Sequence, residues 1–276
     1  MEFIKISTKN HFVGSRLDVF SQNFIEKLEE YMHNSEFEAS DEEPSEKAFK
    51  PAALLSYPNK GAKDGFKLVV VRKEEELAFG SMFAFIKDIG RIYEGEFATL
   101  YVWENGVEAQ VELNLNFSQL VFYDMSFVQM RAFYTPNSKI KARVYAVAYR
   151  ANVVEDSVIE IEVNEQNQAA FSDKKIGEKV GIHTGQMRQF IGGVDEMDYD
   201  EYQLRGKVSA VRKIRLESFE KEAFVCTIDA LYDGDEEFYY FDVLITEEVW
   251  QSDSLPQIDS FISVYGYFCG ELLLLR

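Results

Sequence analysis

The residues best suited to chemistry in this sequence are carboxylates in its second half. Residues 195–201 read Asp-Glu-Met-Asp-Tyr-Asp-Glu, and a second acidic group surrounds Gly234. Carboxylates interleaved with aromatic rings can steer a basic partner at long range and then anchor it by burying the rings. We therefore expect an acidic binding face made of Asp195, Glu196, Asp198, Tyr199, Asp200, Glu201, Asp233, Asp235, Glu236 and Glu237.

Two other interpretations of these carboxylates stay open. Asp198 and Asp200 could hold Mg²⁺ or Ca²⁺ weakly, and a solvated linker would account for the same two residues. The segment from Asp229 has aspartate and glycine at EF-hand-like offsets, but Leu231 occupies a ligand position and Tyr240 stands where a glutamate is needed. That segment is therefore expected to be a hairpin turn, and we predict neither a metal site nor a cofactor.

Other catalytic chemistries find no support in the sequence. His183 lies in a glycine-containing loop, where it is either a ligand contact or an ordinary surface residue. Cys226 and Cys269 lie in apolar, strand-like stretches and are expected to be buried, reduced thiols. The chain has no HExxH, CxxC, GxSxG or phosphate-binding loop pattern, so no catalytic residue is predicted.

The charge of the chain is strongly negative and unevenly distributed. The net charge is −19; residues 1–150 hold 18 basic and 22 acidic residues, or −4, and the remainder holds 11 and 26, or −15. Such a field repels phosphates and acidic membranes and attracts basic proteins. No run of 18 apolar residues occurs, so we expect a soluble, cytoplasmic protein. A short basic stripe interrupts the acidic half: Arg205, Lys207, Arg212, Lys213 and Arg215.

One amphipathic helix is predicted near the N-terminus. Apolar residues recur every three or four positions through residues 17–32, and Ser15 could cap the helix. Residues 36–64 are rich in charge and contain three prolines, which predicts a surface loop that is mobile near residues 41–45.

Most of the remaining chain has the alternation typical of β-strands. Apolar and polar residues alternate through residues 107–117, 140–148, 159–163 and 224–231. The dipeptides Asn105-Gly106 and Asp233-Gly234 each stand between two such runs, a pattern typical of β-hairpins.

Two segments share an internal similarity. Pro136 precedes Val144-Tyr145 by eight residues, and Pro256 precedes Val264-Tyr265 by the same eight, at an offset of 120. This spacing is consistent either with a duplicated β unit or with chance. Each unit has the order strand, strand, hairpin strand, short helix, closing strand, and in the second unit Leu255-Pro256-Gln257-Ile258-Asp259 precedes a strand that contains Gly266 and Gly270. This order and this ending resemble an OB-fold. The resemblance implies that a barrel face or its loops bind a ligand.

We accordingly predict a β-rich α+β fold with two antiparallel β-barrel or sheet units, the second OB-like, and the N-terminal amphipathic helix. The expected domains are an α+β domain over residues 1–164 with the mobile loop 36–64, a Gly-rich acidic linker over 165–201, and a small antiparallel barrel over 202–276.

The functional hypothesis is a non-enzymatic acidic protein that docks on a basic protein, as an inhibitor or immunity protein would. We expect neither nucleic acid nor membrane as its partner. One alternative is an OB-like module that binds single-stranded nucleic acid, through the basic stripe, or an oligosaccharide. The other is a metal-dependent hydrolase that uses carboxylates.

Overall fold

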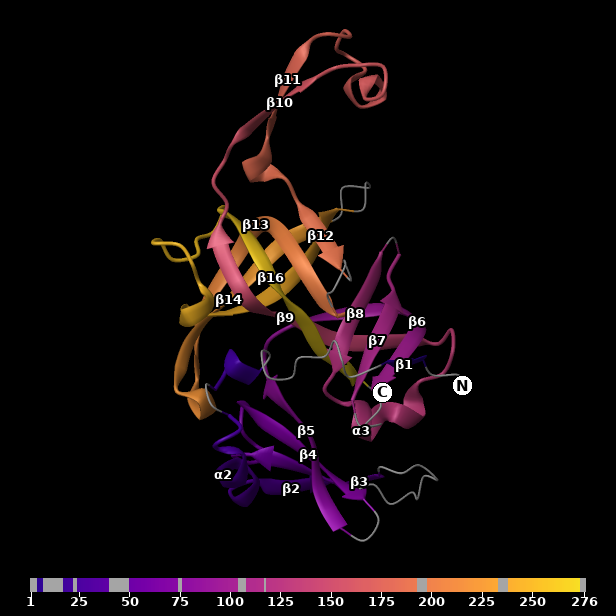
Figure 1. Cartoon of the computed structure of the whole chain (residues 1–276), viewed down its shortest axis with the longest axis vertical. Helices are drawn as coiled ribbons and strands as arrows, with labels where there is room; N and C mark the ends of the chain where they lie inside the picture. The colour runs from indigo at the N-terminus through magenta and orange to yellow at the C-terminus, as the bar shows by residue number, and fades with distance from the viewer. Residues whose placement is uncertain are drawn as a thin grey trace.

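The computed structural model describes residues 4–6, 17–21, 24–39, 50–73, 76–103, 108–116, 118–192, 198–232 and 238–273. They form a large mixed sheet, a four-stranded antiparallel sheet and a two-stranded arm, with short helices in some of the connections (Figure 1). The predicted β-rich α+β class is therefore confirmed.

Five strands of the large sheet pair in a closed circuit, which we call the first ring. Neighbours in it are antiparallel, except that β8 and β16 run parallel, with Tyr123 beside Cys269. In order around the circuit, the strands are β6 (Arg91–Trp103), β7 (Ala109–Asn114), β8 (Gln119–Asp124), β16 (Phe261–Leu273) and β9 (Lys139–Val153), which returns to β6.

A second ring of five strands has the same pattern of pairing. Its one parallel contact joins β15 to β9, with Val243 beside Ala146. The other neighbours in this circuit are antiparallel. Its strands are β13 (Glu201–Leu216), β14 (Lys221–Tyr232), β15 (Phe238–Thr246), β9 and β16, which returns to β13.

The two rings share β9 and β16, and these strands exchange roles between them. In the first ring β16 makes the parallel contact and β9 closes the circuit; in the second ring the reverse holds. The similar dipeptides of the sequence, Val144-Tyr145 and Val264-Tyr265, lie on these two strands. The strands of residues 201–273 therefore do not close a ring by themselves, because β9 supplies the fifth position.

The first hydrophobic core fills the two rings with side chains from alternate strand positions. On β14, Phe224, Cys226 and Ile228 belong to this core, whereas Ala223 and Val225 belong to a second one. The alternation predicted for this strand is therefore confirmed.

The second core lies between the rings and the four-stranded sheet. Leu68 and Met82 from the sheet share this core with Tyr145 and Tyr267 from the rings. The sheet runs in the order β2 (Glu36–Ala39), β3 (Lys50–Tyr57), β4 (Asp64–Lys73) and β5 (Glu76–Ile86).

The N-terminal part differs from two predictions. Residues 17–18 are helical, residues 24–27 form a turn and α2 (Leu28–His33) follows, so no continuous helix covers residues 17–32. Leu17, Phe20 and Tyr31 are nevertheless buried in the second core, as the apolar spacing predicted.

The expected loop at 36–64 instead contains β2 and β3, because backbone pairing of its apolar part with β4 outweighs the local effect of its prolines. Residues 40–49 lie outside the described residues.

A β-hairpin arm projects from the second ring at the top of Figure 1. Strands β10 (Val158–Glu162) and β11 (Lys179–His183) pair antiparallel, and β12 (Gln189–Gly192) then returns to pair with β13. The expected linker at 165–201 therefore includes two strands. The domain boundaries stay a prediction, and Asp195 and Glu196 lie outside the described residues.

The remaining elements are short. No helix among the described residues is long and apolar enough to cross a membrane. Strand β1 (Ile4–Ile6) pairs parallel with β6. The short helices are α3 (Phe127–Met130), η1 (Arg131–Phe133), η2 (Gln168–Phe171), η3 (Thr184–Gln186), η4 (Glu217–Phe219) and η5 (Glu247–Val249).

Candidate functional site

The described members of the predicted acidic face are held at the start of β13. The side chains of Asp198 and Asp200 are 6% and 0% exposed, so they do not form a solvated linker. Tyr199 between them is 46% exposed, and Glu201 accepts a hydrogen bond from the Tyr149 hydroxyl at 3.3 Å. The remaining members lie outside the described residues: Asp195, Glu196, Asp233, Asp235, Glu236 and Glu237.

Tyr199 lines a groove built from both rings, which we call the aromatic groove. Its ring stacks on Tyr101 of β6, with centroids 4.4 Å apart and planes at 14°. Phe190 of β12 packs against Tyr202 of β13 at 4.8 Å. The groove has a volume of about 320 Å³ and is lined by Tyr101, Glu112, Ser118, Gln119, Val121, Phe190, Gly192, Tyr199 and Tyr202.

Hydrogen bonds fix the polar groups of the aromatic groove. The Tyr101 hydroxyl donates to Oε2 of the buried Glu112 at 2.7 Å. Burial, together with this carboxylate, raises the pKa of Tyr101. No lysine or arginine occurs among the described residues that line the groove. The described part of its walls therefore presents aromatic rings and one carboxylate.

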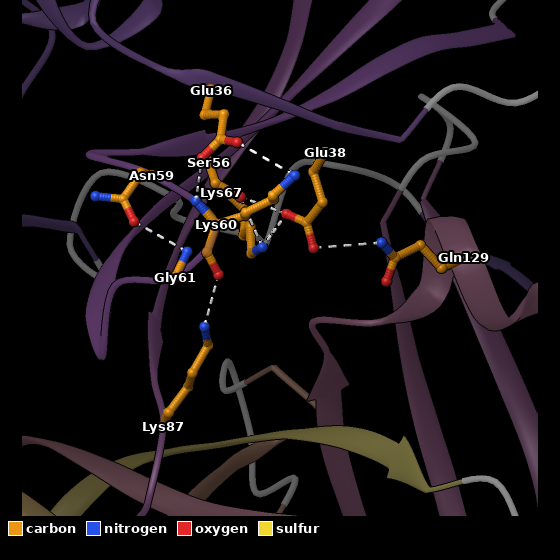
Figure 2. A network of polar contacts seen from close by, with 9 residues as sticks. All are labelled: Glu36, Glu38, Ser56, Asn59, Lys60, Gly61, Lys67, Lys87 and Gln129. Atoms are coloured by element: carbon orange, nitrogen blue, oxygen red, sulfur yellow. Dashed lines mark hydrogen bonds and ion pairs between the residues drawn. The ribbon is translucent and has the colours of Figure 1, made fainter.

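A second polar cluster joins the four-stranded sheet to the first ring. Figure 2 shows Lys67 and Ser56 converging on Glu38, with Gln129 approaching the same carboxylate from α3. Lys67 Nζ also donates to Ser56 Oγ at 2.8 Å. Burial lowers the pKa of Lys67. The hydrogen bond from its ammonium to Glu38 raises the pKa but does not offset the effect of burial.

A cavity of about 140 Å³ opens beside this cluster, and we call it the basic cavity. Its cations are Lys60, Lys67, Lys87 and Arg143, and its carboxylates are Glu38 and Glu271. The rest of its lining is Leu54, Phe83, Phe85, Ile86, Met125, Ser126, Gln129 and Tyr145.

The other candidate residues are held by local contacts. His183 Nδ1 lies 2.8 Å from the Asp156 carboxylate at the base of the arm, and the hydrogen bond between them lowers the pKa of Asp156. Cys226 and Cys269 are buried and form no disulfide, as predicted. Burial raises the pKa of the Cys226 thiol to about 12. Among the residues that the structure describes, no three His, Cys, Asp or Glu side chains group as a metal site would require.

Carboxylates pair with most of the basic stripe. Lys207 contacts Asp259 at 2.6 Å, Arg215 contacts Glu222 at 2.9 Å, and Lys213 contacts Glu222 at 3.6 Å. A stripe with its charge balanced in this way attracts phosphates weakly.

No family model, curated protein or solved structure matches the chain.

Sequence reasoning identified part of the aromatic groove and none of the basic cavity. Tyr199 stood out because it lies between two aspartates. Tyr101, Glu112 and Phe190 gave no local signal, since they come from three different strands and meet only through the pairing of the rings.

Proposed function

We propose that this protein is a binding protein that takes a cationic side chain of a basic protein partner into the aromatic groove. The observation that carries the proposal is the composition of the groove: stacked tyrosines and Glu112 line it, and no cation among the described residues does.

Physical chemistry favours a cation in such a groove. An ammonium or guanidinium group is attracted to the face of a tyrosine ring by about 0.5–2 kcal/mol, more when the contact is desolvated. Glu112 adds a carboxylate that already lies beside the Tyr101 hydroxyl, and an arginine can bond to it in two-point geometry. The net charge of −19 steers a basic partner towards the surface.

We further propose that the two rings are interlocked OB-type barrels. In the first ring the small helical segment is α3 with η1, just before β9; in the second ring it is η5, before β16. In OB-folds the second and third strands and the adjoining loops form the usual binding face. Glu112 lies on β7, the second strand of the first ring, and Gln119 and Val121 lie on β8, the third. The aromatic groove is therefore located where such a barrel binds its ligand.

This geometry favours a basic protein over the alternative ligands. Single-stranded nucleic acid requires cations beside the stacking rings, and the groove lining contributes none among the described residues. An oligosaccharide would use the same rings without needing the carboxylate to be charged, so the test below separates it from a cationic ligand.

The test measures binding of a fluorescein-labelled oligoarginine peptide by fluorescence polarisation, beside a neutral peptide of equal length, oligothymidylate and maltohexaose. We expect binding of the oligoarginine peptide only, weakened by added salt. Tyr199→Ala and Glu112→Gln should each weaken it by about tenfold. Their matched controls, Phe133→Ala and Glu160→Gln, change exposed residues away from the groove and should bind as the unchanged protein does.

Two results would overturn the proposal. One is equal affinity for the neutral and basic peptides; the other is an equal loss of affinity in the groove variants and their controls. Salt-insensitive binding of maltohexaose that Tyr199→Ala removes would assign the groove to an oligosaccharide instead.

A further inference from the structure

The basic cavity concentrates positive charge in a protein that is otherwise acidic. Over the whole chain 29 basic residues face 48 acidic ones, whereas four cations and two carboxylates line this cavity. Among the described residues the lining thus has two more cations than carboxylates, and one of these cations, Lys60, pairs with Glu36 outside the lining. Because like charges repel, such a cluster raises the free energy of the fold unless a counter-charge occupies it.

The cations come from two separate parts of the fold. Lys67 lies on β4, Lys60 precedes β4, and Lys87 follows β5, all in or beside the four-stranded sheet. Arg143 lies on β9 of the rings. The cavity thus lies between two packed layers, which is a common location for small-molecule sites.

Carboxylates of the described residues pair with three of the four cations. Glu38 binds Lys67, and Glu271 binds Arg143 at 3.1 Å. Lys60 pairs with Glu36, outside the cavity lining, at 3.2 Å. The Lys87 ammonium donates a hydrogen bond to the Lys60 carbonyl oxygen, at 2.9 Å (Figure 2).

Two of the ammonium groups lie close to one aromatic ring. Lys67 Nζ is 4.9 Å and Lys87 Nζ is 5.5 Å from the centroid of Phe85. This ring therefore holds both side chains near the cavity, where their charges repel each other. An anion that contacts both groups would relieve that repulsion.

The remaining walls suit a small organic group. Leu54, Phe83 and Tyr145 are buried apolar or aromatic residues that line the cavity. Ser126 and Gln129, at α3, add neutral hydrogen-bonding groups. The lining thus combines cations for a doubly charged head with an apolar side for a small attached group.

We infer that the basic cavity is a binding site for a phosphoryl dianion, held by Lys87, Lys67, Lys60 and Arg143. The dianion is either inorganic phosphate or the head of a small phosphate monoester. This site is separate from the aromatic groove, so its test and the test of the proposed function succeed or fail independently.

The experiment titrates the full chain by isothermal calorimetry with inorganic phosphate and, separately, with phenyl phosphate, against sodium chloride of matched ionic strength. We expect saturable binding of a phosphoryl compound. Tighter binding of phenyl phosphate assigns the site to a monoester, because its ring reaches the apolar side; equal or weaker binding assigns it to inorganic phosphate.

Variants locate the binding. Lys87→Gln removes an exposed cation and should weaken binding by about tenfold, whereas Lys87→Arg should retain it. The matched control, Lys175→Gln, removes an exposed lysine of the arm and should bind as the unchanged protein does. Thermal melting of each variant without ligand verifies folding.

Absence of saturable binding for both compounds would overturn the inference. An equal loss of affinity in Lys87→Gln and Lys175→Gln would also overturn it, because binding would then reflect total charge rather than this cavity.

Discussion

The backbone N–H of Val121 donates a hydrogen bond to the hydroxyl oxygen of Tyr202 across 2.8 Å. This bond joins β8 of the first ring to β13 of the second. A reciprocal bond, with the strand positions exchanged, is donated by the Tyr93 hydroxyl on β6 to the Tyr240 carbonyl on β15, at 2.6 Å. In each case the first strand of one ring is bonded to the third strand of the other.

Replacing Tyr202 by Phe should therefore destabilise the fold. The ring stays, but the buried N–H of Val121 loses its acceptor, which costs about 1–3 kcal/mol. Urea denaturation measures the loss. Tyr93→Phe is the matched variant for the reciprocal bond and should lower stability in the same direction, whereas an unchanged midpoint in both would show that these bonds do not contribute to stability.

The two rings should unfold together, because each contains β9 and β16. Trp103 lies on β6, and Trp250 packs against the first core beside β9. Each of the variants Trp103→Phe and Trp250→Phe keeps one tryptophan. In each variant the urea midpoint from the fluorescence of that tryptophan should equal the midpoint from far-UV circular dichroism. Separate midpoints within one variant would mean that the rings are independent.

Truncating Phe268 should affect both rings at once. This side chain of β16 is buried against Tyr202 and Phe241, with ring centroids 4.8 and 5.3 Å away. Phe268→Ala should cost about 3–5 kcal/mol, measured as a lowered midpoint for every spectroscopic probe. A change confined to one tryptophan signal would contradict this expectation.

Asp124 should make stability depend on pH. Burial raises the pKa of this carboxyl to about 6 from 3.8, although the hydrogen bonds from Ser126 and Tyr134 oppose the shift. The folded state thus holds the proton more tightly than the unfolded state, and its stability falls as pH rises from 3.8 to about 6. The loss is on the order of 3 kcal/mol.

Asp124→Asn should remove that part of the pH dependence. Urea titrations at pH values across this interval provide the measurement. A variant whose stability still falls as steeply as that of the unchanged protein would assign the effect to other groups.

The thiols should be inert while the protein is folded. Cys226 and Cys269 are buried, and burial raises the pKa of Cys226, so neither forms an accessible thiolate. Ellman's reagent should react with both only after denaturation. Ser172→Cys, at an exposed position of the arm, is the positive control and should react at once; rapid reaction of the native unchanged chain would contradict the burial.

Local patterns in the sequence predicted several strands and two hairpins, but they missed β2 and β3 in the expected loop and identified no distant strand partner. The alternation of Phe224, Cys226 and Ile228 identified β14 and the face that it buries. Strands β6 and β7, and likewise β14 and β15, pair antiparallel on either side of the two predicted turn dipeptides, which lie outside the described residues. The pairing of β9 with β16 could not be predicted in this way, because periodicity carries no information on which distant strand is adjacent.

The same limit explains the differences at the candidate sites. In the sequence, Asp198 and Asp200 look like surface residues within an acidic run. In the structure both are buried, and the backbone carbonyl of Asp200 accepts a hydrogen bond from the Phe268 N–H of β16 at 2.9 Å. Lys67 and Arg143 are far apart in sequence and line one cavity only because the four-stranded sheet packs on the rings.

The sharing of β9 and β16 also determines when the chain can fold during its synthesis. The ribosome makes β6, β7, β8 and β9 well before β16, yet β8 and β9 both need β16 as a neighbour to complete the first ring. Until then these strands expose unpaired edges, which are prone to aggregate. Contacts of such long sequence separation also make folding slow. We therefore expect these edges to become protected only once β16 has left the ribosome and paired with them.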